Sequence, residues 1–97
     1  MAGNLEFLNQ LETIIDQRIR SSNPESYVHR LFHSGLDRIL KKVTEEAGEV
    51  VIACKNNHAD ETLNESADLL FHLMLALKSQ GHSICDVVRV LKQRHGT

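Results

Sequence analysis

Four acidic residues in two short motifs could carry chemistry. Glu46 and Glu49 stand three positions apart, and so do Glu65 and Asp68. Residues at this spacing share one face of a helix, so each pair can direct two carboxylates at the same point. Carboxylate oxygens are the ligands that Mg²⁺ prefers, and Mg²⁺ commonly completes its shell with water and substrate phosphates. The motifs therefore indicate a site for a hard divalent cation, and the alternative is a solvated acidic helix face.

The charges around these motifs are unevenly distributed. Between Glu45 and Asp68 there are seven acidic residues and one basic residue, Lys55, although the whole chain has 11 basic and 13 acidic residues and a net charge of −2. Arg38, Lys41 and Lys42 precede the first motif, near the start of a predicted helix where the helix dipole disfavours cations. A phosphate ligand explains these cations better than helix stability does. The balanced net charge argues against a dedicated nucleic-acid or membrane binder.

Apolar residues at helical spacing predict the elements that carry these side chains. The predicted helices cover residues 5–20, a short segment from residue 26 to residue 32, residues 36–54, a segment after the loop 56–58 that ends near residue 80, and a last helix that begins after Ser83. Ser83 and Asp86 have the spacing of a capping box. No strand pattern is present, so we predict an all-α bundle of four to five helices in a single domain, residues 1–97.

The third and fourth predicted helices are joined by a short loop, so they should pack as an antiparallel hairpin that brings the two acidic motifs together. Residues 69–77 (LLFHLMLAL) are apolar around nearly the whole helix circumference. A helix of this kind is buried on all sides, and a chain of 97 residues has little else to cover it. We therefore expect a homodimer, with a monomeric bundle as the alternative.

Other residues favour simpler interpretations. Cys54 and Cys85 are too few for a disulfide scaffold and read as free thiols that pack in apolar rows. His29 and His33 are four apart but lack the other ligands of a zinc site, and the Glu-x-x-His motifs of di-iron bundles are absent. We expect His72 to be a packed histidine. The chain shows no export signal and no membrane-spanning run, which favours a cytoplasmic protein.

The segment GLDRILKKVTEEAGEVVIACKN, followed by ESADLLFHL, resembles the phosphoribosyl-ATP pyrophosphatases, which belong to the MazG-like all-α nucleoside triphosphate pyrophosphohydrolases. The resemblance covers nearly the whole chain. It implies that Mg²⁺ is bound by Glu46, Glu49, Glu65 and Asp68, with Glu45 available for a second ion or for positioning water. Gly48, inside the first motif, departs from the Ala or Thr expected there.

The resemblance also implies an activity. The expected reaction is Mg²⁺-dependent hydrolysis of 1-(5-phosphoribosyl)-ATP to 1-(5-phosphoribosyl)-AMP and pyrophosphate, the second step of histidine biosynthesis. Glu45, Glu46 and Glu49 are then the candidate catalytic residues, and the candidate phosphate-binding residues are Arg38, Lys41, Lys42 and Lys55. Two alternatives remain open: a MazG-like pyrophosphohydrolase that removes unwanted nucleoside triphosphates, and a non-catalytic helical interaction module.

Overall fold

Five helices follow one another in this computed structural model, which describes residues 3–96. They are α1 (Phe7–Arg20), α2 (Tyr27–His33), α3 (Leu36–Lys55), α4 (Ala59–Ser79) and α5 (Ile84–His95). The described residues contain no β-strand, so the all-α prediction is confirmed. The predicted helices agree with these bounds to within about two residues, and the largest difference is the start of α1.

Side-chain caps explain why several helices begin where they do. The Ser26 hydroxyl accepts a hydrogen bond from the His29 backbone N–H at 3.3 Å, at the start of α2. At the start of α5, the predicted capping box between Ser83 and Asp86 is present in both directions. Such caps satisfy N–H groups that have no partner within the helix. The start of α4 was harder to predict, because its cap is the Nδ1 atom of His58.

The turn between α4 and α5 depends on glycine. Gly81 has a φ of 79°, a left-handed conformation that other residues rarely adopt. The backbone N–H groups of Gly81 and His82 donate to the carbonyls of Lys78 and Leu77, at 3.0 and 2.8 Å. These two bonds form a Schellman motif, which ends α4 and sends the chain into α5.

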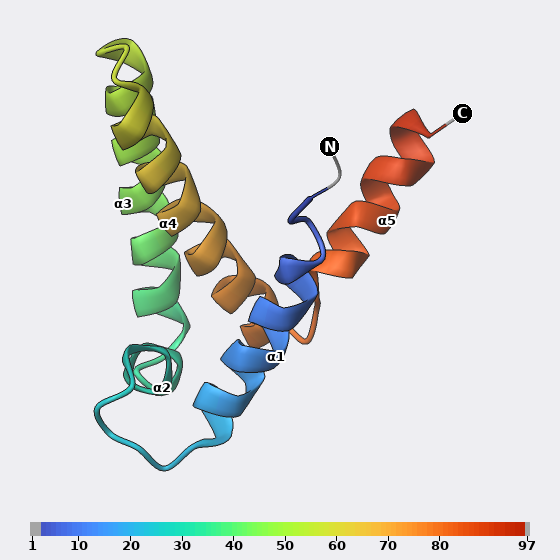
Figure 1. Cartoon of the computed structure of the whole chain (residues 1–97). Helices are drawn as coiled ribbons and strands as arrows, with labels where there is room; N and C mark the ends of the chain where they lie inside the picture. Colours follow the sequence, from blue (N-terminus) through green and yellow to red (C-terminus); the bar gives the residue numbers. More distant parts are fainter. Residues whose placement is uncertain (1–2, 97) are drawn as a thin grey trace.

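The helices form an open V (Figure 1). The antiparallel hairpin of α3 and α4 is one arm, and α5, beyond the start of α1, forms the other. The short helix α2 lies below the start of α3, at the closed end of the V (Figure 1). The radius of gyration is 14.6 Å, whereas a compact chain of this length has about 12.5 Å, so the shape is unusually extended for its size.

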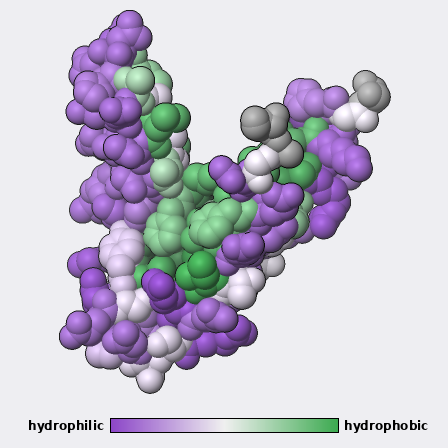
Figure 2. All heavy atoms as spheres, viewed as in Figure 1, coloured by the Kyte–Doolittle hydropathy of each residue, from purple (hydrophilic) through white to green (hydrophobic). Residues whose placement is uncertain are grey.

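The apolar core lies at the closed end of the V, where all five helices contribute. Its fully buried side chains include Ile15, Ile39, Met74 and Leu75, from α1, α3 and α4. The outer part of the hairpin leaves large apolar side chains exposed, including Val51, Ile52 and Leu63. Figure 2 shows apolar atoms gathered along the inner side of the V. The core therefore anchors one end of the hairpin and leaves much of its inner face uncovered.

The apolar segment 69–77 belongs to this core, as predicted, although Leu73 remains 36% exposed in the single chain. The packing role predicted for the cysteines is wrong within one chain, because Cys54 and Cys85 are both exposed. Cys54 follows the apolar row of α3 to a level of the hairpin that the core does not reach. Both thiols are free, as expected. No helix among residues 3–96 combines the length and apolarity needed to cross a membrane.

Candidate functional site

Three of the four predicted metal ligands converge between α3 and α4. Glu46 lies on α3, Glu65 and Asp68 lie on α4, and each offers a carboxylate oxygen within 4.8 Å of those of the other two. The antiparallel hairpin produces this arrangement by placing the middle of α3 beside the first half of α4. The side chain of Glu46 is only 13% exposed. We call Glu46, Glu65 and Asp68 the carboxylate cluster.

Glu49, the fourth predicted ligand, lies next to this cluster rather than within it. Partial desolvation raises the pKa of Glu65 above its usual 4.5, and the negative charges of Glu49, Asp68 and Glu46 raise it further. Mutual repulsion of this kind is expected when carboxylates share a site without a cation. The donor set consists of hard oxygens on two facing helices and fits a hard divalent cation.

Lys42 connects the carboxylate cluster to the basic residues that precede it. Its amino group lies 3.4 Å from a Glu46 oxygen and 3.6 Å from a Glu45 oxygen, one turn farther along α3. Partial burial opposes the charged form of Lys42, but Tyr27 and the two carboxylates outweigh it and raise the lysine pKa. Glu45 is therefore held beside the cluster through Lys42.

A hydrogen-bonded pair that the sequence did not predict lies beside the cluster. The Tyr27 hydroxyl of α2 is 2.7 Å from Nε2 of His72 on α4, and Nδ1 of His72 is 2.7 Å from the Asp68 carbonyl oxygen. A carbonyl only accepts, so Nδ1 carries the ring proton and Nε2 accepts the hydrogen bond from Tyr27. Burial, together with the charges of Glu46 and Asp68, raises the pKa of Tyr27, while Lys42 opposes this. His72 is buried, as expected, and fixes the Tyr27 ring next to the cluster.

The predicted phosphate-binding cations separate into two groups. Arg38, Lys41 and Lys42 line one hollow of 310 Å³ together with Tyr27 and Glu45. Lys55 stands at the end of α3, nine positions beyond Glu46, which is about 14 Å along a helix. Lys55 therefore does not line the hollow that Arg38, Lys41 and Lys42 share.

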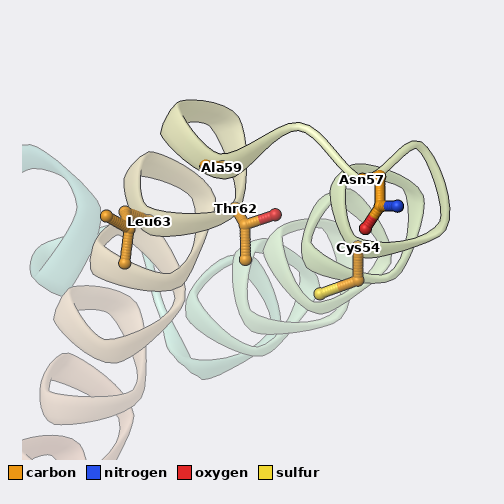
Figure 3. A pocket seen from close by; sticks show the side chains of 5 residues that line it. All are labelled: Cys54, Asn57, Ala59, Thr62 and Leu63. Carbon is orange, nitrogen blue, oxygen red and sulfur yellow. The ribbon is translucent and has the colours of Figure 1, made fainter.

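Two further features do not form part of this site. His29 and His33 pack with their ring centres 4.4 Å apart, and the His33 ring bonds to the Ile19 carbonyl oxygen, so this pair serves packing rather than zinc binding. A hollow at the loop end of the hairpin is lined by Cys54, Asn57, Ala59, Thr62 and Leu63 (Figure 3). None of the predicted ligands or phosphate-binding residues lines it.

Residues 8–95 match the family described as phosphoribosyl-ATP pyrophosphohydrolase. A phosphoribosyl-ATP pyrophosphatase of Leptospira biflexa is 44% identical over 91 residues, which cover 94% of this chain and 99% of the relative. The chain belongs to the phosphoribosyl-ATP pyrophosphohydrolase family. Another member, from Pyrobaculum calidifontis, is 42% identical over 90% of this chain and 93% of its own length.

Some relatives of this pyrophosphohydrolase are longer. A histidine biosynthesis bifunctional protein of Thermus thermophilus is 48% identical over 88 residues, which cover 91% of this chain and 41% of the relative. The chain therefore spans less than half of that bifunctional relative and nearly the whole of the Leptospira protein. The family assignment confirms the resemblance seen in the motifs, and it favours an enzyme over an interaction module.

Proposed function

We propose that this chain hydrolyses the α,β-phosphoanhydride of 1-(5-phosphoribosyl)-ATP, giving 1-(5-phosphoribosyl)-AMP and pyrophosphate, in the second step of histidine biosynthesis. The observation that carries the proposal is the convergence of Glu46, Glu65 and Asp68 oxygens within 4.8 Å, in a chain of this family. Full-length relatives that carry the same activity in their names support it.

The proposed cofactor is Mg²⁺, held by Glu46, Glu65 and Asp68 with Glu49 beside them. The oxygen donors and the crowding of negative charge around Glu65 fit a divalent cation. When bound, Mg²⁺ would neutralise triphosphate charge and increase the acidity of a coordinated water. No covalent nucleophile is required for hydrolysis of this kind.

The remaining residues supply contacts and a proton acceptor. Lys42, Lys41 and Arg38 line a hollow that begins beside the cluster, which supports a role for these cations in phosphate binding. Glu45 lies within 3.6 Å of Lys42 and is the candidate acceptor for the proton of the attacking water. Lys55 is no longer needed in this scheme, because it lies far along α3 from Glu46.

We also propose that the active form is a homodimer. The exposed area of the chain is 7050 Å², whereas a compact monomer of 11.0 kDa exposes about 5,600 Å². Stable interfaces bury about 800 Å² on each partner, so the excess suffices for one. A second copy, with the same apolar inner face, is the occupant that this argument favours. The chain is proposed to act as a single domain, residues 1–97, in the cytoplasm.

Pyrophosphate release tests the reaction. The purified chain should release pyrophosphate from phosphoribosyl-ATP in Mg²⁺ far faster than from ATP, dCTP or dUTP, and chelation should abolish release. A preference for dCTP or dUTP would instead support an enzyme that removes unwanted nucleotides. No release from any substrate would leave only the interaction module.

Variants of the cluster test the ligand assignment. Glu46→Gln and Asp68→Asn should each lower kcat/KM by at least about 100-fold, and the double variant should lose little more, because ligands of one ion act as a unit. Glu6→Gln, on an exposed residue before α1, is the matched control and should retain full activity. Additive and small losses would show that the carboxylates are ordinary surface acids.

A further inference from the structure

A basic groove extends from the carboxylate cluster along α2 and α3. Two hollows, of 240 and 310 Å³, share Tyr27 and Arg38 in their walls. The larger hollow adds Lys41, Lys42 and the carboxylate of Glu45, at the end next to the cluster, and the smaller adds Arg30. Because they share walls, the two hollows form one groove, with Tyr27, Leu31 and Arg38 near its middle. Arg30 was not among the phosphate-binding residues predicted from the sequence.

The positive charge of this groove is largely uncompensated. Among residues 3–96, Lys42 has carboxylate partners within 4.0 Å, whereas Arg30, Arg38 and Lys41 have none. One Arg30 nitrogen, Nη1, donates to the backbone carbonyls of Glu25 and Pro24, at 2.8 and 3.3 Å. These bonds hold the guanidinium in place and leave its other N–H groups available. A fixed guanidinium with free donors suits a phosphate, which it can contact through two parallel hydrogen bonds.

The arginine end is too far from the cluster to serve the same phosphate. Arg38 and Glu46 are eight positions apart on α3, which corresponds to about 12 Å along the helix axis. Tyr27 lines both hollows, and its hydrogen bond to His72 holds its ring on the side of the cluster. The groove therefore presents the cation site at one end, the ring of Tyr27 and the side chain of Arg38 along its middle, and Arg30 at the other end.

Phosphoribosyl-ATP has its chemical groups in the same order. Its triphosphate is at one end, its adenine is in the middle, and the second ribose carries a monophosphate at the other end. An aromatic side chain can stack on a base, and arginines bind a monophosphate. ATP lacks the phosphoribosyl group and its monophosphate, so contacts at the arginine end would distinguish the two nucleotides.

We propose that Arg30 and Arg38 bind the monophosphate of the phosphoribosyl group, with Tyr27 against the adenine, and that this subsite selects phosphoribosyl-ATP over ATP. The inference rests on the proposed function, since it assigns the far end of the same substrate. It differs from a triphosphate-binding role, in which the arginines would contact ATP and phosphoribosyl-ATP equally.

The products provide a direct binding test, because phosphoribosyl-AMP and AMP differ by the phosphoribosyl group. Their dissociation constants are measured by calorimetry in Mg²⁺ for the full chain, Arg38→Gln, Arg30→Gln and the control Arg94→Gln. The full chain and the control should prefer phosphoribosyl-AMP. Each groove variant should weaken phosphoribosyl-AMP by at least about tenfold and AMP by much less. Equal weakening of both ligands, or no weakening, would overturn the subsite, as would equal affinity in the full chain.

Kinetics separate this inference from the proposed reaction. Arg38→Gln should raise KM for phosphoribosyl-ATP with a much smaller change in kcat, because the monophosphate lies away from the bond that breaks. Among residues 3–96 the Arg38 side chain makes no hydrogen bond, whereas that of Arg30 makes two, so Arg38→Gln should fold normally even if Arg30→Gln does not. If the full chain releases no pyrophosphate from phosphoribosyl-ATP, the proposed function fails, and calorimetry still decides whether the groove recognises the monophosphate.

Discussion

The hydrogen bond between Tyr27 and His72 joins α2 to α4 beside the carboxylate cluster. Its direction is fixed because the other ring nitrogen is engaged with the Asp68 carbonyl oxygen. His72 therefore orients Tyr27, and the same ring is tied to the backbone of a proposed metal ligand. Changes to this pair should affect both stability and the placement of substrate.

Tyr27→Phe should destabilise the protein by about 1 kcal/mol, because it leaves the buried Nε2 of His72 without a donor. Urea unfolding at a fixed protein concentration measures the difference. Replacing both partners, as in Tyr27→Phe with His72→Leu, should cost less than the sum of the two single changes. Strictly additive losses would mean that the hydrogen bond contributes nothing.

Glu65 gives a stability prediction whose sign depends on pH and metal. Its pKa is raised in the folded protein, so the folded state favours the protonated form, and metal-free stability should fall as pH rises above 4.5. Glu65→Gln should therefore raise the melting temperature in chelator at pH 7 and have little effect below pH 4.5. In Mg²⁺ the wild type should gain stability and the variant should not.

Thermal unfolding in EDTA and in Mg²⁺, at both pH values, measures this reversal. Glu25→Gln, an exposed change outside the cluster, is the control and should behave as the wild type does. A metal-free Glu65→Gln protein that melts below the wild type at pH 7 would contradict the repulsion on which the cation site is argued.

The meeting of the acidic motifs was predictable from spacing, and three cations of the groove were candidates from the sequence, but the positions of Tyr27 and Arg30 beside them were not predictable. Glu46, Glu65 and Asp68 meet because they lie on adjacent helices joined by a short loop, which is a local property of the sequence. Tyr27 and His72 are 45 positions apart, so their contact depends on how α2 crosses the hairpin. The assignment of Arg30 to the same groove depends on that crossing as well.

The helices themselves were largely set by local signals. Helix α1 ends where the helix-breaking segment 21–24 (SSNP) begins. The capping box marks the start of α5, and Gly81 follows the end of α4. The prediction that Cys54 packs in an apolar row was wrong within one chain, and the reason lies in the extent of the core. Periodicity identifies the apolar side of α3 but does not indicate how far along that helix the core extends.

The capping box of α5 should make the stability of this helix depend on pH. The Ser83 backbone N–H and the Arg89 side chain hold the pKa of Asp86 below its usual 3.8. The charged carboxylate therefore stabilises the folded state above pH 3.8, and this contribution is lost as pH falls through the lower folded value. Asp86→Asn should lower the melting temperature at pH 7, with a difference that shrinks below pH 3.8.

Melting curves from pH 7 to pH 3 measure that difference. Asp37→Asn is the matched control, because Asp37 also lies in the first turn of a helix but its N-cap residue, Gly35, offers no side-chain cap. An Asp86→Asn deficit that stays constant across this range would show that the charge of the carboxylate is not what stabilises the cap.

The open V leaves large apolar side chains of the hairpin exposed, which is the main argument for the proposed homodimer. Sedimentation equilibrium at micromolar concentration should give twice the chain mass of 11.0 kDa. Leu63→Asp, on a side chain that is 70% exposed, should shift the equilibrium toward monomer, whereas Asn64→Asp at the neighbouring exposed position should not. A stable monomer of 11.0 kDa in the unmodified protein would contradict the dimer.

The position of the core at one end of the hairpin also implies a gradient of local opening along α3 and α4. Amide hydrogens near Met74 and Leu75 should exchange with solvent only on global unfolding, whereas those near Val51 and Leu63 should exchange through small local openings. Glu46, Glu65 and Asp68 lie between these regions and join the two helices. Adding Mg²⁺ should therefore slow exchange in the outer half of the hairpin while leaving the closed end unchanged relative to global stability, so that cation binding would be recorded as protection at residues that never touch the ion.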